Sequence, residues 1–474
     1  MNQPAALQRV AEPLGDAIEF RDSRLLIARP ALVRDRIEIL ARLAVFGREP
    51  DRGVARWLIR RLALEAGAVP ASIQALYLAR GRGEVREDFT VPAMNLRALP
   101  FHAARAVFRA AKALEAGALI FEIARSEMGY TDQRPSEYAS TVLAAAIAEG
   151  YQGPVFIQGD HFQASVRRYA ASPDAEVKAL RDLSDEAIRA GFFNIDIDTS
   201  TLVDLKKPTI AEQQALNYTL CAELTAAIRK MEPKGVTISV GGEIGEVGGQ
   251  NSTEPELRAF MQGYNEALRR AAPGAAGLSK ISIQTGTSHG GVVLPDGSIA
   301  KVNVDFETLA GLSHLARQEF GLGGAVQHGA STLPEQAFRR FAEAGAVEVH
   351  LATNFQNMLF DRLPAALRRE MYAYLDKNHG GERKPDQSDE QFYYRIRKNA
   401  LGPFKSDLWS VPDGALAEIE AAWEKQFLLL FDRLNIGKTK RDVEKHVKAP
   451  KIQPPLSDYA ADLAQAEDVR DLAD

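Results

Sequence analysis

Three histidines of this chain each follow within a few residues of the end of a short apolar run, a placement that could bring their imidazoles together around a metal ion. These are His161, His289 and His328. The runs before them cover residues 155–158, 281–284 and 324–327. Three imidazole ligands that leave one coordination position open to substrate are typical of a catalytic zinc site rather than a structural one. The sequence therefore predicts that these three side chains bind one divalent ion.

Carboxylates accompany the histidines at the ends of the apolar runs. Asp160 immediately precedes His161, so one residue of this pair can bind a metal while the other faces the reacting bond. A carboxylate in that place suits proton transfer with a substrate hydroxyl. Asp198 and Glu243 end two further runs, and they could hold a second metal position or orient the histidine ligands. For Asp198, a simple cap of the following helix is an equal alternative.

Glycine-rich turns surround two of the three histidines. Gly290 follows His289, and Gly329 follows His328 and leads to Ser331. Such turns expose backbone N–H groups, and the helix that follows adds its positive end, so an anion such as phosphate is favoured. The combination predicts a phosphate site beside the metal.

The elements that must position these residues are short apolar runs alternating with longer amphipathic segments. We expect strands at residues 91–95, 118–124, 155–158, 193–198, 236–240, 281–284, 325–327 and 347–351. This alternation predicts parallel strands with helical crossovers. Eight such units match a (β/α)8 TIM barrel, whose active site lies at the carboxyl ends of the strands. An open doubly wound sheet is the alternative, but no G-x-G-x-x-G motif opens a helix after the first run.

Helical segments are expected on both sides of the barrel. Residues 1–86 have a helical period of apolar side chains and are predicted to be a helical N-terminal extension. Residues 87–362 are the predicted barrel, and residues 363–474 are a predicted helical C-terminal extension. These large helical flanks lead us to expect a homo-oligomer.

Composition narrows the class of protein. The chain is 46% hydrophobic and 26% charged, with a formal net charge of -5 and no dominant basic block, so no nucleic-acid partner is expected. A single cysteine excludes a disulfide framework and a cysteine zinc cage, and it fits a cytoplasmic location. We find neither a signal-peptide pattern nor an apolar run long enough for a membrane span.

At these residues the chain resembles the class II, metal-dependent fructose- and tagatose-bisphosphate aldolases. The resemblance covers about residues 90–361 and depends on four motifs. The Asp160–His161 pair is similar to the Asp-His pair that ends the family's third strand. The segment that begins at Glu243 is similar to the family's E-L-G-x-x-G-G motif. The segments around His289 and His328 are similar to its G-T-x-H-G and H-G-G-S motifs.

The resemblance implies a role for each matching residue. Asp160 is implied as the catalytic acid/base. The implied metal ligands are His161, His289, His328 and Glu243. The implied substrate- and phosphate-binding residues are Asn95, Ser126, Gly290, Gly329, Ser331, His350 and Thr353. The implied cofactor is Zn²⁺ or another divalent transition metal, with a monovalent cation as a further possibility. Two positions depart from the family pattern, because Gln158 replaces a histidine of the third strand and His350 replaces a substrate-contacting asparagine.

The resulting hypothesis is a class II aldolase, a lyase that cleaves or forms a carbon–carbon bond of a ketose phosphate. The ion would polarise the ketone and stabilise a dihydroxyacetone-phosphate-like enediolate. A Schiff-base mechanism is disfavoured, because Lys280 begins its strand and so lies at the wrong end. Two alternatives stay open: a metal-dependent epimerase or isomerase of sugar phosphates, and a non-catalytic aldolase-like barrel subunit.

Overall fold

The computed structural model describes residues 3–21, 24–245, 250–286, 294, 304–459 and 472. Its centre is a closed barrel of eight parallel strands, in which each strand pairs with the next along the chain and the last pairs with the first. The strands are β4 (Val91–Asn95), β5 (Ile120–Ala124), β6 (Gly153–Gln163), β7 (Asn194–Asp198), β8 (Ser239–Glu243), β9 (Lys280–Ile283), β10 (Ala325–Gln327) and β11 (Glu348–Leu351). The predicted TIM barrel is thereby confirmed, and every predicted run contributes one strand.

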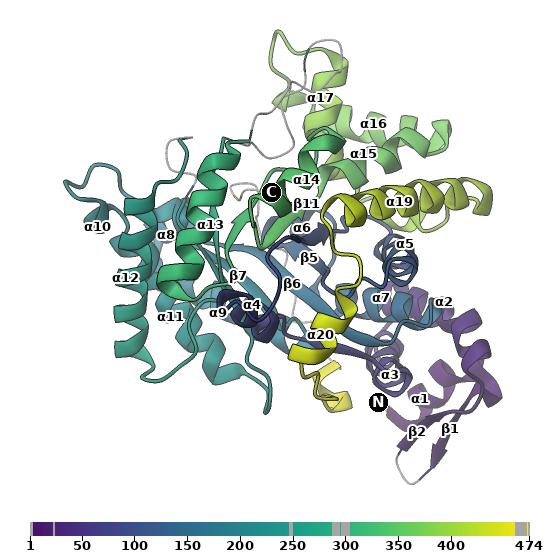
Figure 1. The fold of residues 1–474 in the computed structure, drawn as a ribbon. Coiled ribbons are helices and arrows are strands. Elements are labelled where there is room, and N and C mark those ends of the chain that lie inside the picture. Colours follow the sequence, from purple (N-terminus) through teal and green to yellow (C-terminus); the bar gives the residue numbers. More distant parts are fainter. Residues whose placement is uncertain are drawn as a thin grey trace.

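Helices surround the barrel (Figure 1). They are α5 (Pro100–Ala113), α6 (Arg125–Tyr130), α7 (Pro135–Ala148), α8 (Val166–Ala171), α9 (Pro173–Ala190), η2 (Ser200–Leu202), α10 (Ile210–Gln213), α11 (Ala215–Met231), α12 (Glu254–Ala271), α13 (Phe306–Phe320), α14 (Glu335–Glu343) and α15 (Thr353–Arg362). The start of α12 follows from its sequence, because Thr253 and Glu256 form a capping box: the Thr253 N–H donates to the Glu256 carboxylate at 2.7 Å. The fifth predicted strand begins later than expected, at Ser239 instead of residue 236.

The N-terminal segment is helical only in part. It contains α1 (Gln3–Ala11), η1 (Glu12–Ala17), the antiparallel strands β1 (Ile18–Arg21) and β2 (Arg24–Ile27), α2 (Pro30–Phe46), α3 (Asp51–Ala66), β3 (Ala68–Ala71) and α4 (Gln74–Gly81). The predicted helical extension over residues 1–86 therefore also contains three short strands. The third of them, β3, pairs in parallel with the first four residues of β6. The edge of β6 is open at its first residues because β7 pairs with β6 only from Gln158 onward.

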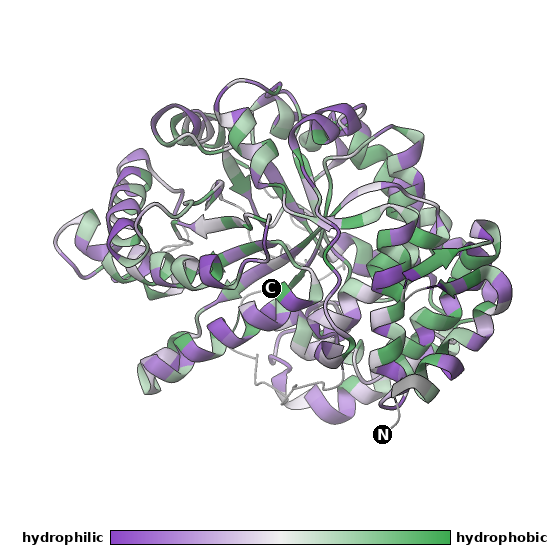
Figure 2. Cartoon of the chain, turned by 90° about the horizontal axis from the view of Figure 1, so that it is seen from below, coloured by the Kyte–Doolittle hydropathy of each residue, from purple (hydrophilic) through white to green (hydrophobic). Residues whose placement is uncertain are grey.

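The C-terminal segment is helical, as predicted. It contains α16 (Ala365–His379), η4 (Gly380–Glu382), α17 (Asp389–Ile396), η5 (Arg397–Ala400), α18 (Lys405–Leu408), α19 (Asp413–Arg433), α20 (Lys440–His446) and η6 (Leu456–Tyr459). Helix α19 packs against α5, α14 and α15 of the barrel. Figure 2 shows hydrophobic residues along the barrel strands and in the helices beside the N-terminus.

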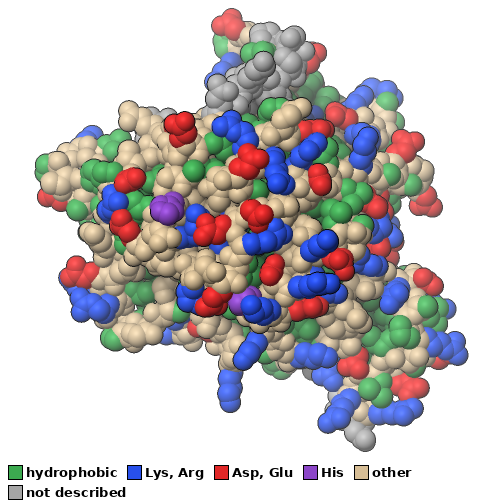
Figure 3. Space-filling view, viewed as in Figure 1, with side chains coloured by type: hydrophobic (Ala, Val, Ile, Leu, Met, Phe, Trp, Pro, Cys, Tyr) green, Lys and Arg blue, Asp and Glu red, His purple; other side chains and the backbone are tan. Residues whose placement is uncertain are grey.

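Charges of both signs are interspersed over the face of the molecule shown in Figure 3. Among the described residues, no helix combines the length and the apolar character that crossing a bilayer requires.

Trp423 tests how firmly α19 belongs to the barrel core. Its side chain is buried, and its indole N–H donates to the backbone oxygen of Phe355 at 3.0 Å. We expect Trp423→Ala to lower the free energy of unfolding by about 3–5 kcal/mol, because it removes a large buried side chain and leaves a cavity. Urea unfolding measures the change, and Lys425→Ala, on the exposed side of the same helix, is the control. A loss below about 1 kcal/mol would show that α19 is only loosely attached.

Candidate active site

The candidate site is a small cavity at the carboxyl ends of the barrel strands. Its lining residues are Asn95, Arg97, Glu127, Asp160, His161, His328, Gly329, Ser331, His350, Ala352 and Thr353. Eight residues that the sequence predicted for the site therefore line one cavity.

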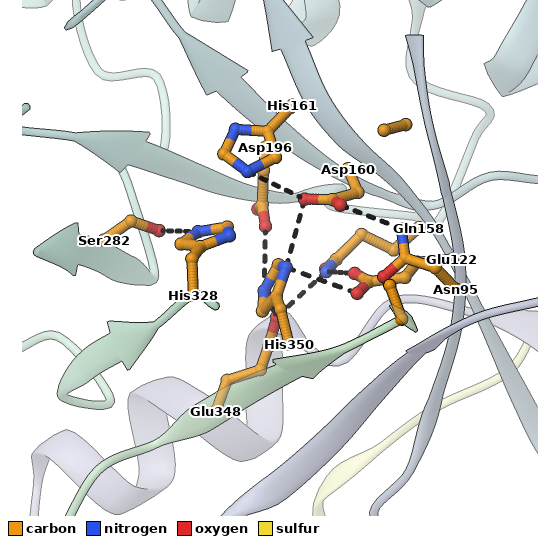
Figure 4. Close-up of polar contacts among 12 residues, drawn as sticks. Asn95, Glu122, Gln158, Asp160, His161, Asp196, Ser282, His328, Glu348 and His350 are labelled. Atoms are coloured by element: carbon orange, nitrogen blue, oxygen red, sulfur yellow. Dashed lines mark hydrogen bonds and ion pairs between the residues drawn. The ribbon is translucent and has the colours of Figure 1, made fainter. Parts of the chain in front are cut away.

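Two of the three predicted histidine ligands meet at this cavity. The ring centroids of His161 and His328 lie 4.3 Å apart, and Nε2 of His328 is 3.0 Å from the Ser282 hydroxyl (Figure 4). His161 adopts a positive φ of 38°, at an irregularity in the pairing of β6 with β7. Such bulges re-aim side chains next to active sites. The third predicted ligand, His289, and its neighbour Gly290 lie outside the described residues.

Carboxylates surround the ring of His161. Its Nδ1 lies 3.2 Å from Oδ2 of Asp198 and 3.5 Å from Oε2 of Glu243. Burial by itself would lower the pKa of His161, but the charges of Asp160, Asp198 and Glu243 outweigh it and raise this pKa well above its ordinary value. The pKa of Asp198 is lowered, because hydrogen bonds and the His161 charge more than offset its burial. Asp198 and Glu243, whose roles the sequence left open, thus both contact one predicted metal ligand.

Donor atoms of two groups around His161 lie close enough to hold an ion. One group is Asp160, His161 and His328, and the other is His161, Asp198 and Glu243. In each group the candidate ligand atoms lie within 4.8 Å of one another. Imidazole and carboxylate donors in this mixture suit zinc and several other divalent transition metals.

Asp160 is held between two neighbours. Its Oδ1 lies 3.0 Å from Nδ1 of His350, and its Oδ2 accepts a 2.9 Å hydrogen bond from the amide of Asn95. Burial favours the neutral acid, but the charges of His161 and His350 prevail and hold the pKa of Asp160 well below its usual range. Asp160 is therefore a carboxylate at neutral pH and can accept a proton.

Three of the predicted phosphate-binding residues, Gly329, Ser331 and Thr353, also line the cavity. Gly329 has a φ of 68°, a left-handed conformation that glycine adopts without strain. The Ser331 hydroxyl accepts a hydrogen bond of 2.5 Å from the backbone N–H of Ala352. Thr353 is the first residue of α15, whose positive end favours an anion. Ser126, in contrast, is buried in the first turn of α6 and is not among the residues that line the cavity.

Sequence reasoning missed a charged network inside the barrel, directly below the cavity. Its residues are Tyr77, Glu122, Gln158, Asp196, Lys280, Glu348 and His350. The Lys280 ammonium, expected at the wrong end of its strand, reaches Gln158 at 2.7 Å and Asp196 at 2.9 Å. Gly241 makes room, since a Cβ there would collide with both Asp196 and Lys280. The sequence feature that could have indicated the network is a charged residue, such as Glu122, inside a strand whose other residues are apolar and expected to be buried.

Sequence reasoning also missed a buried ion pair, which lines the cavity itself. The Arg97 Nε donates to Oε1 of Glu127 at 2.6 Å, and Oε2 of Glu127 accepts from the amide of Asn95 at 2.8 Å. Both charged side chains are buried. Arg97 lies two residues after Asn95, the last residue of β4. This place beyond the carboxyl end of a barrel strand was the only feature of the sequence that could have indicated a role for Arg97 in the site.

The barrel and the site together define a (β/α)8 protein in which histidine and carboxylate side chains, able to bind a metal ion, gather at the carboxyl ends of the strands. The chain belongs to the class-II fructose-bisphosphate aldolase family, whose model matches residues 84–401, about two thirds of the chain. This confirms the family that the four sequence motifs indicated.

Solved structures that this chain resembles are distant in sequence. A probable tagatose 6 phosphate kinase from Sinorhizobium meliloti 1021 is 16% identical, with a TM-score of 0.52 over 75% of this chain and 99% of that one. This likeness shows the fold alone. A fructose-bisphosphate aldolase from Campylobacter jejuni is 18% identical, with a TM-score of 0.44 over 76% of this chain and 93% of that one. A putative fructose-1,6-biphosphate aldolase from Coccidioides immitis is 18% identical, with a TM-score of 0.42 over 77% and 96%.

Proposed function

We propose that the protein is a metal-dependent class II aldolase that cleaves or forms a carbon–carbon bond of a ketose phosphate. The observation that supports this most is the meeting of Asp160, His161 and His328 at one cavity that Gly329 and Thr353 also line. A proton acceptor, metal-type donors and an anion-binding turn thus face the same space.

The residues of the site fit a divalent ion. His161 and His328 would hold it together with a carboxylate, for which Glu243 is the first candidate, and the family resemblance adds His289. The carboxylates around His161 leave an excess of negative charge that an ion would balance. When bound, a divalent ion supplies Lewis acidity that polarises a substrate carbonyl. Zinc is our first choice among the transition metals.

Asp160 is the proposed proton-transfer group. Its carboxylate would accept the hydroxyl proton of the departing aldehyde half in the cleavage direction and return it in synthesis. The hydrogen bonds from His350 and Asn95 keep both of its oxygens in defined positions at the cavity.

The phosphate group would bind at the turn around Gly329. Ser331 and Thr353 offer hydroxyl groups there, and the N-terminus of α15 adds positive potential. A phosphate at this place would direct the other end of the sugar toward Asp160 and His161.

The proposal extends to partners and location. We propose a cytoplasmic homo-oligomer that acts on a small sugar phosphate, in keeping with the single cysteine and the mild negative charge of the chain. Phe20, Ile39 and Phe46 are exposed apolar side chains in the N-terminal segment, where a second copy could pack.

Metal analysis combined with a screen of ketose phosphates tests the proposed reaction. We expect about one divalent ion per chain and release of an aldehyde from at least one ketose phosphate, with activity lost on chelation and restored by metal. Chelator-resistant activity that borohydride abolishes in the presence of substrate would overturn the metal assignment. Products with an intact carbon skeleton would favour an epimerase or isomerase, and a purified protein that binds no metal would favour a non-catalytic subunit.

A further inference from the structure

The charged network below the cavity is unusual for the interior of this type of barrel, which branched apolar side chains normally fill. Lys280 and Glu348 are completely buried, and their side chains approach to 2.5 Å. Taking charges out of water is costly, and even a well-paired buried network does not always recover that cost, so a network of this size suggests a compensating benefit. The position of the network suggests that the benefit is the orientation of Asp160, because the network ends at that residue.

Glu348 is the most fully bonded carboxylate of the network. Its Oε1 accepts from Lys280 at 2.5 Å and from Gln158 at 2.9 Å, and its Oε2 accepts from the Tyr77 hydroxyl at 2.5 Å. The charge of Lys280, followed by the hydrogen bonds from His350 and Gln158, overcomes the effect of burial and lowers the pKa of Glu348 to about 2. Glu348 is thus a permanent acceptor at neutral pH.

A permanent acceptor at Glu348 determines the orientation of the His350 ring. Nε2 of His350 lies 2.7 Å from Oε1 of Glu348, so this nitrogen must carry a hydrogen and donate it. The other nitrogen, Nδ1, then faces Asp160 Oδ1 at 3.0 Å and Glu122 Oε1 at 3.2 Å (Figure 4). Histidines that orient a reacting or ligating group are commonly fixed in this way by a carboxylate on the second ring nitrogen.

We propose that Glu348, anchored by Lys280, is a positioning residue that acts through His350 to hold the Asp160 carboxylate toward the cavity. The chain of contacts runs from Lys280 through Glu348 and His350 to Asp160. His350 thereby has a different task from the substrate-contacting residue that the family pattern places there. The proposal rests on the proposed function, because it takes Asp160 as the proton-transfer group.

The kinetic test uses two variants and one matched control. Glu348→Gln removes the anchoring charge. The double variant Lys280→Met/Glu348→Gln also removes the buried cation, so it leaves the net charge of the interior unchanged and serves if the single variant fails to fold. We expect kcat to fall by about 10²-fold with KM and metal content near wild type, the loss that a displaced catalytic group causes. Glu137→Gln breaks another buried glutamate–lysine pair, with Lys405 at 2.7 Å, and should leave kcat unchanged. A folded double variant with wild-type kcat, or with KM and metal content lost together with kcat, would overturn the proposal.

A second measurement does not depend on turnover. In protein labelled with ¹⁵N in the histidine rings, the His350 signals are assigned by their disappearance in His350→Gln. We expect the wild type to show a hydrogen on Nε2 of His350, and the Glu348→Gln or double variant to change these signals while Glu137→Gln does not. If no ketose phosphate is turned over, the proposed function fails, and the ring signals alone decide the positioning claim. His350 signals that are the same in wild type and in the Glu348 variants would refute it.

Discussion

Replacing Asp160 with asparagine is expected to lower kcat for aldol cleavage by about 10²–10⁴-fold, the contribution of a well-placed general acid or base. The change keeps the size of the side chain and its contact with Asn95, but it removes the proton acceptor. Because the pKa of Asp160 is held well below its usual range, the wild-type group is ionised throughout the neutral range, and the loss should not depend on pH there. Steady-state kinetics on the active ketose phosphate measures it.

Metal content decides how an inactive Asp160→Asn variant is interpreted. Asp160 also belongs to a group of possible metal donors with His161 and His328. If Asp160 acts in proton transfer, the variant keeps its metal ion and only its kcat is lowered. If the purified variant lacks metal, Asp160 is a ligand and the proton-transfer role is wrong. Asp182→Asn, on an exposed face of α9, is the control and should behave as wild type.

The barrel could be predicted from the sequence because each strand is a short apolar run between turn residues. Two departures show where local pattern is insufficient. β3 is only four residues long and contains Pro70, so nothing local distinguishes it from the start of a helix. It forms because the first part of β6 has an edge that β7 does not cover. The β1–β2 pair was missed in the same way, since each strand has only four residues.

The candidate site could be predicted in outline because polar residues at strand ends converge in a closed barrel. Asp160, His161 and His328 do meet, and Asp198 and Glu243 join them. The sequence could not show that a bulge turns His161 toward two carboxylates.

The partners within the interior network lay beyond prediction for a different reason. A lysine at the first residue of a strand reads as exposed, and only the three-dimensional pairing of Lys280 with Glu348 shows that it is buried. A charged pair whose members lie on different strands leaves no spacing pattern in the sequence.

Metal binding is expected to depend strongly on pH because His161 must lose a proton to become a ligand. Its pKa is raised well above the ordinary histidine value, so in the metal-free protein it carries a proton at neutral pH, and each ion that binds should displace about one proton. Apparent affinity should therefore rise about tenfold per pH unit until the raised pKa is reached. The sign for stability is opposite: the protonated ring stabilises the metal-free fold below the ordinary pKa of histidine, and this contribution is lost as the pH rises through the raised value.

Competition titrations with a zinc chelator, and calorimetry in two buffers of different ionisation enthalpy, measure the affinity and the protons released. His161→Ala should abolish tight binding, whereas His314→Ala, an exposed histidine on α13, should change nothing. Asp198→Asn removes one of the carboxylates that raise the His161 pKa, so the rise of affinity with pH should end at a lower pH. It also removes a group that orients the ligand, so it should weaken binding by about 10–100-fold. Affinity that is independent of pH would mean that His161 is neutral before the ion arrives, and the carboxylates around it would then need another counter-charge.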